Sequence, residues 1–170
     1  MQFTARVITD KNDLACFLRR AITTKPVQNQ NSTTVQTLTT CSTFDISKGE
    51  WLHSHSFTLE HSAHVAWKTS KGILLMGGHQ NPNKTTFISA GPQQAGFNLR
   101  QPFRHACIIP NPLTKTAYII GGYHKEHLTK VIEYSEDGFV RELPNLNSGR
   151  YRHACSSYYD EQQNLVRLNV

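Results

Sequence analysis

Histidine is the residue type with the widest chemical range in this chain, which has nine histidines among 170 residues. Four of them, His53, His55, His61 and His64, fall within one short stretch. A zinc site needs its donor atoms to converge within about 2.1 Å of the metal. His53 and His55 share one face of a strand, but His61 lies across a connecting loop and His64 belongs to a recurring structural position described below. We therefore predict no metal site.

Other reactive side chains also have structural explanations. No Gly-x-Ser-x-Gly elbow and no phosphate-binding Gly-x-x-x-x-Gly-Lys loop occurs in the sequence. Cys107 and Cys155 each follow a histidine by two residues, which predicts small apolar side chains at buried first-strand positions, with a disulfide between them as the alternative. The six tyrosines are interpreted as packing residues. We predict no catalytic residue, no cofactor and no enzyme activity.

A repeated diglycine shows which elements must position these residues. Gly77-Gly78 and Gly121-Gly122 each end an apolar run, and the second pair follows the first by 121 − 77 = 44 residues. Three histidines recur with them: His64 and His153 are 89 residues apart, and His105 lies between them. Gly49 and Gly138, both in turns, are also 89 residues apart. Self-similarity at this period indicates a repeat architecture.

Each repeat contains four short strands and no helix. In the better-defined repeat, strands are predicted at 104–109, 116–120, 130–134 and 139–143, from β-branched and aromatic runs bounded by turn residues. The preceding repeat has the same order, at 63–68, 73–76, 85–89 and 97–99. A four-stranded unit of about 40–50 residues is typical of one blade of a β-propeller.

These residues resemble kelch repeats, within the galactose oxidase central-domain-like superfamily. The resemblance rests on the diglycine after an apolar strand, on the Arg-His-Ala strand opening, and on Trp51 after a glycine turn, and it covers residues 33–170. Val140 replaces the late tryptophan in a later repeat, and the middle unit is shorter. The resemblance implies an all-β fold: a partial β-propeller of about three kelch-type blades, each with four antiparallel strands.

The repeats divide the chain into a non-repeat segment, 1–32, and four repeat units. The units are a partial blade at 33–54, full blades at 60–100 and 103–144, and a truncated blade at 150–170. An apolar stripe predicts a short helix over residues 13–22, within a segment that is otherwise irregular. Because propellers typically close with four to eight blades, this arrangement predicts a fragment of a larger propeller.

Charge and targeting signals limit the partners. The net charge of +6 comes from scattered basic residues, which favours a solvated surface over nucleic-acid binding. The sequence shows no membrane span and no signal peptide, so a cytoplasmic location is favoured while the compartment stays undefined. Asn31 and Asn83 begin glycosylation sequons, which matter only in a secreted chain.

Arg104 and Arg152 are the candidate partner-binding residues. They precede histidines at matching positions, and kelch domains bind partners near the central channel, so the resemblance implies a role in partner binding. The alternative is an ion pair or hydrogen bond that supports the start of each blade. We expect a non-enzymatic protein–protein interaction module, with a scaffold role and an unidentified protein partner. A fragment of a ubiquitin-ligase substrate adaptor and a fragment of a copper radical oxidase are the alternatives.

Overall fold

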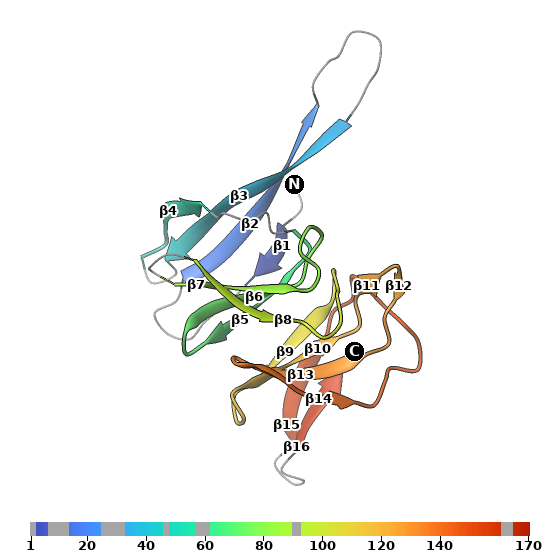
Figure 1. Ribbon diagram of the computed structural model, residues 1–170. Helices are drawn as coiled ribbons and strands as arrows, with labels where there is room; N and C mark the ends of the chain where they lie inside the picture. The colour runs from blue at the N-terminus through green and yellow to red at the C-terminus, as the bar shows by residue number, and fades with distance from the viewer. Residues whose placement is uncertain are drawn as a thin grey trace. The chain divides into compact units, whose positions relative to one another are not determined.

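The computed structural model describes residues 3–6, 14–24, 33–45, 48–56, 62–89, 93–160 and 165–170, and every helix or strand assigned within them is a β-strand (Figure 1). The chain forms two compact units, Met1–Ser62 and Ala63–Val170. The all-β class predicted from the sequence is confirmed.

The first unit contains one antiparallel sheet with its strands in chain order. These are β1 (Phe3–Arg6), β2 (Leu14–Thr24), β3 (Thr33–Asp45) and β4 (Glu50–Ser56). The segment predicted to precede the repeats therefore supplies two strands of a complete four-stranded sheet. Trp51 lies in β4 opposite Phe44 and is 58% exposed, so it does not occupy a buried packing position.

The helix predicted over residues 13–22 is wrong, because this segment belongs to β2. It pairs with β3 from Leu14 opposite Asp45 to Thr24 opposite Thr33. A helix of this length is marginal in isolation, and a short apolar run does not by itself distinguish helix from strand. The long antiparallel ladder with β3 satisfies the backbone hydrogen bonds that a helix would otherwise have satisfied.

The second unit contains two further four-stranded antiparallel sheets, and the strands predicted from the sequence are found in both. The first has the order β5-β6-β7-β8: β5 (Val65–Thr69), β6 (Gly72–Met76), β7 (Lys84–Ile88) and β8 (Gln94–Asn98). The second has the order β14-β13-β10-β9: β9 (Cys107–Asn111), β10 (Thr116–Ile120), β13 (Val131–Ser135) and β14 (Gly138–Leu143).

Two short ribbons complete the described elements of this unit. β11 (Tyr123–His124) and β12 (Glu126–His127) form a two-stranded ribbon within the connection from β10 to β13. β15 (Ser156–Asp160) and β16 (Leu165–Asn169) form a second two-stranded sheet. The second ribbon falls in the segment predicted as a truncated blade.

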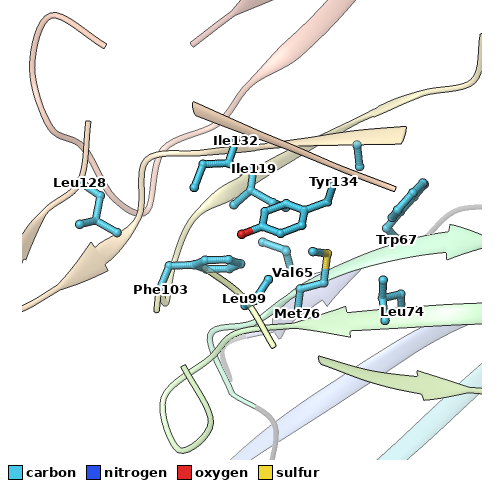
Figure 2. Close-up of a cluster of buried hydrophobic side chains, with 11 residues drawn as sticks. Val65, Trp67, Leu74, Met76, Leu99, Phe103, Ile119, Leu128, Ile132 and Tyr134 are labelled. Atoms are coloured by element: carbon cyan, nitrogen blue, oxygen red, sulfur yellow. The ribbon is translucent and has the colours of Figure 1, made fainter. Parts of the chain in front are cut away.

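The sheets of the second unit pack face to face. Val65, Trp67, Leu74 and Met76 come from sheet β5–β8, and Ala117, Ile119, Ile132 and Tyr134 come from the next sheet; together they form one buried cluster. Figure 2 shows the ring of Tyr134 lying among side chains from both sheets. Burial of these apolar side chains provides the main stabilisation between the two sheets.

The sheet that contains β10 is buried on both faces. Alternate residues of a strand point to opposite sides, so Ala117 and Ile119 join the cluster of Figure 2, while Tyr118 and Ile120 join a second cluster. Leu168 of β16 packs against this second cluster. Within the second unit, four-stranded antiparallel sheets that pack in chain order make a partial propeller-like fold, as the sequence predicted.

Candidate partner-binding site

The two diglycines lie at the ends of β6 and β10, the second strands of their sheets, where the sequence analysis placed them. Gly77 and Gly121 have φ of +67° and +59°, which a residue without a Cβ adopts without strain. The second glycine of each pair donates a hydrogen bond to the segment leading to the next sheet, from Gly78 N to Phe103 O at 2.9 Å and from Gly122 N to Arg150 O at 2.8 Å. Each diglycine therefore fixes the chain that enters the neighbouring sheet.

A second backbone contact corrects the predicted alignment of the three histidines. His105 N donates to Ala63 O at 2.8 Å, and Arg152 N donates to His105 O at 3.0 Å. Ala63, His105 and Arg152 also share a positive φ, of 58°, 53° and 53°. His105 is thus equivalent to Ala63 and Arg152, whereas His64 and His153 lie one residue further along. By residue type, the two Arg-His-Ala-Cys segments align with each other. The backbone hydrogen bonds place the second segment one residue out of that alignment.

Arg104 is held in place by contacts from three directions. Its backbone forms a bridge with Tyr123, with N–O distances of 3.1 and 2.8 Å. Its guanidinium carbon lies 4.8 Å from the centre of the Tyr123 ring, close enough for a cation–π interaction. Its Nη1 donates to Nε2 of His79 at 2.8 Å. The supporting hydrogen bond considered in the sequence analysis is therefore present, and its partner is a histidine.

Tyr151 is the centre of a group of aromatic rings. Its ring centre lies 4.7 Å from that of His127 in a stacked geometry, 5.6 Å from that of Tyr123 and 6.4 Å from that of His105. The guanidinium of Arg152 lies 5.7 Å from the same ring. Tyr151 is 38% exposed, so part of this ring group faces solvent.

These side chains form one surface, which we call the arginine–aromatic surface and define as His79, Arg104, His105, Tyr123, His127, Tyr151 and Arg152. They come from the connections that follow the diglycines and from the segments that lead into β9 and β15. The two predicted arginines thus lie on one connected set of ring contacts.

Both arginines keep their positive charge available. Among the described residues, no carboxylate forms an ion pair with Arg104 or Arg152. The neighbouring ribbon carries one base and one acid, Lys125 and Glu126, both exposed. A planar guanidinium with unused N–H donors is suited to bind a carboxylate with two parallel hydrogen bonds.

His153 packs closely against Gly121. A Cβ placed on Gly121 would lie 3.1 Å from His153 Cε1, which shows how closely the imidazole packs there. Both ring nitrogens are buried without a hydrogen-bond partner among the described residues. Burial, with a smaller contribution from the charge of Arg150, lowers the pKa of His153 below its usual value. The neutral imidazole therefore acts as a packing group beside the glycine.

The structure corrects the interpretation of Cys107 and Cys155 as reduced apolar residues. The two form a disulfide with Cα atoms 6.1 Å apart, across 48 residues of sequence. Cys107 begins β9, and Cys155 immediately precedes β15. The bond therefore links the first strand of one sheet to the residue that precedes the first strand of the next, at Cα positions within the reach of a disulfide.

The remaining sequence predictions concern metals and membranes. In the described part of the chain, no group of three or more His, Cys, Asp and Glu side chains is placed to hold a metal. Two of the predicted positions, His61 of the histidine cluster and Asn31 of the first sequon, fall outside the described residues. Within the described ranges, no helix has the length and apolar character needed to cross a membrane.

Sequence reasoning found the two arginines but missed the rings beside them. Tyr123 and Tyr151 were assigned to packing, and His79 and His127 were given no role. The signal for Tyr151 was its place between Arg150 and Arg152, because a guanidinium close to an aromatic ring can form a cation–π interaction.

Comparison with known proteins gives a structural likeness only. No protein-family model and no curated protein matches the sequence. Among solved structures, the chain is similar to one described as the structure of YjhT, with a TM-score of 0.63 and 9% identity over 86% of this chain. The match covers 53% of that structure, so the chain spans about half its length. At this identity the likeness shows the fold alone.

Proposed function

We propose that this chain is a kelch-type, non-enzymatic interaction module that binds an acidic segment of a protein partner on the arginine–aromatic surface. One observation carries the proposal: Arg104 and Arg152 each lie over a tyrosine ring, on one connected surface, with no carboxylate partner among the described residues. Aromatic and arginine side chains are the types most enriched at protein–protein hot spots.

The geometry favours carboxylates as the ligand groups. Each guanidinium is already oriented by its tyrosine, and Arg104 also by His79. A side chain held in this way loses less conformational entropy when it binds. The rings of Tyr123 and Tyr151 offer apolar contact beside the charges, which suits a peptide in which acidic and apolar residues alternate.

The proposal is tested with a pair of short peptides, one in which glutamate alternates with leucine and serine, and one with glutamine in place of every glutamate. We expect the glutamate peptide alone to bind, measured by isothermal titration calorimetry. Its affinity should fall as salt is raised, because exposed charges are screened.

Variants then locate the binding. Arg104→Ala and Arg152→Ala should each weaken the glutamate peptide about 10-fold or more, since a hydrogen bond to a charged group contributes about 1.5–3 kcal/mol. Lys68→Ala is the matched control, because Lys68 is an exposed cation on β5 outside this surface. If all three variants bind equally well, or if the glutamine peptide binds as tightly as the glutamate peptide, the proposal is wrong.

A further inference from the structure

The connection from β6 to β7 carries an exposed acceptor sequence for N-linked glycans. Asn83, Lys84 and Thr85 form the pattern Asn-x-Thr, with no proline in the middle position. Asn83 is exposed and lies in the turn immediately before β7. Its carbonyl accepts a hydrogen bond from Leu99 N at 2.8 Å, so its backbone is held while its side chain stays accessible.

The neighbouring residues leave room for a glycan in the folded chain. Thr85 is buried and donates from Oγ1 to Phe97 O at 2.7 Å. Lys84 is exposed and donates from Nζ to Asn98 Oδ1 at 3.0 Å. The hydroxyl of Thr85 is needed only during transfer, before this strand folds, and neither contact uses the amide of Asn83. A sugar on Asn83 therefore displaces none of these contacts.

The disulfide supplies an independent reason to place this sequon in a compartment where it is used. Structural disulfides form and persist in oxidising compartments and are rare where thiols are kept reduced. The Cys107–Cys155 bond links β9 to the residue before β15, across 48 residues of sequence, rather than lying in a redox-type Cys-x-x-Cys turn. The same secretory compartments that oxidise such pairs also glycosylate Asn-x-Thr sequences.

We infer that Asn83 is an N-glycosylation site and that the chain acquires the Cys107–Cys155 disulfide in the same oxidising compartment. The donor is a lipid-diphosphate-linked oligosaccharide. Asn83 Nδ2 forms a bond to C1 of the sugar, the bond from C1 to the diphosphate oxygen breaks, one amide proton goes to a base of the transferase, and the lipid diphosphate leaves. Asn83 is not one of the residues that form the arginine–aromatic surface.

The test expresses the full chain behind a secretory signal peptide in a eukaryotic cell, beside the same chain without the signal. Asn31→Gln removes the other sequon, so any glycan on that variant belongs to Asn83. We expect a gel shift that peptide-N-glycosidase removes and that is lost in Asn31→Gln/Asn83→Gln.

Mass spectrometry then locates the glycan. Glycosidase treatment in ¹⁸O water should convert Asn83 to an ¹⁸O-labelled aspartate. Thr85→Ser, which keeps both the sequon and a hydroxyl, should retain the glycan.

Transfer precedes folding, so the shift is read in the cell lysate as well as in the medium, and a variant that fails to leave the cell is still informative. An unshifted Asn31→Gln chain that enters the secretory pathway would overturn the inference. The inference would also be overturned if Cys107 and Cys155 of the secreted chain both reacted with an alkylating reagent before reduction. The two cysteines would then not form a disulfide in the oxidising compartment.

Discussion

Gly121 is the residue at which backbone conformation and close packing coincide most clearly. Its φ is +59°, and an added Cβ would lie 2.6 Å from Arg150 O. That carbonyl is also the acceptor for Gly122 N at 2.8 Å, so it cannot move away without breaking the contact that leads the chain toward β15. The glycine therefore allows the close approach on which the position of Tyr151 and Arg152 depends.

Replacing Gly121 by alanine should lower the free energy of unfolding by at least about 2 kcal/mol, because a left-handed conformation costs about 1–2 kcal/mol and the contact with Arg150 adds to it. Gly49→Ala is the matched control, since its φ is +69° and, among the described residues other than its two chain neighbours, no atom lies within 4 Å of the added Cβ. Urea unfolding measures both. Equal losses in the two variants would show that close packing at Gly121 contributes nothing.

At the level of whole elements, a buried carboxylate ties three strands of one sheet together. Glu133 of β13 has a side chain only 4% exposed. It accepts a hydrogen bond from Thr116 Oγ1 of β10 at 2.7 Å and another from Arg141 Nε of β14 at 2.6 Å. The carboxylate raises the pKa of Arg141 above its usual value, mainly through this hydrogen bond and then through its charge. β14 is thus held at the sheet edge by an ion pair as well as by its ladder.

Arg141→Ala should lower the melting temperature of the chain, because it leaves the buried carboxylate of Glu133 without its cation. Adding Glu133→Gln to this variant should recover part of the loss, since the remaining amide is neutral. Lys130→Ala is the control: it breaks a pair with Glu142 whose side chains are 39% and 41% exposed, and exposed pairs contribute little. An equal fall in the melting temperature for Arg141→Ala and Lys130→Ala would contradict this role of Glu133.

The individual strands also show how much of the fold could be predicted from the sequence. β10 was predicted with the bounds that it has, Thr116–Ile120, because its β-branched run, buried on both faces, is bounded by turn residues and a diglycine. β2 was predicted as a helix, because the spacing of its apolar residues fits either element and only its pairing with the next strand, β3, decides between them. Local patterns identify a strand where burial is strong and fail where strand pairing decides.

The candidate site was predicted only in part, because tertiary contacts bring its side chains together. Arg104 and Arg152 were identified from a repeated segment, but the rings of Tyr123, His127 and Tyr151 meet through contacts between distant parts of the chain. The offset of His105 from His64 and His153 is likewise set by backbone hydrogen bonds rather than by side-chain type. Repeats reveal which residues recur, and tertiary contacts determine which of them meet.

For the molecule as a whole, the second unit shows how stacked sheets generate a binding surface. The sheet containing β10 is covered on both faces by apolar clusters, so most side chains of this strand pack in the core. The connections that leave the diglycines are held by backbone hydrogen bonds to the next segment. Side chains on those connections therefore meet side chains of the segments that enter the next sheet, and the arginine–aromatic surface is the result.

The most direct test of the proposed function is to map which residues of the folded chain an acidic ligand contacts. An NMR titration of the ¹⁵N,¹³C-labelled protein with the glutamate peptide should move the resonances of Arg104, Tyr123, His127, Tyr151 and Arg152 together, with one common dissociation constant. The glutamine peptide should leave those resonances unchanged. Shifts spread evenly over the exposed lysines, such as Lys68, Lys71 and Lys130, with none at Tyr123 or Tyr151, would contradict the proposal that this surface binds the partner.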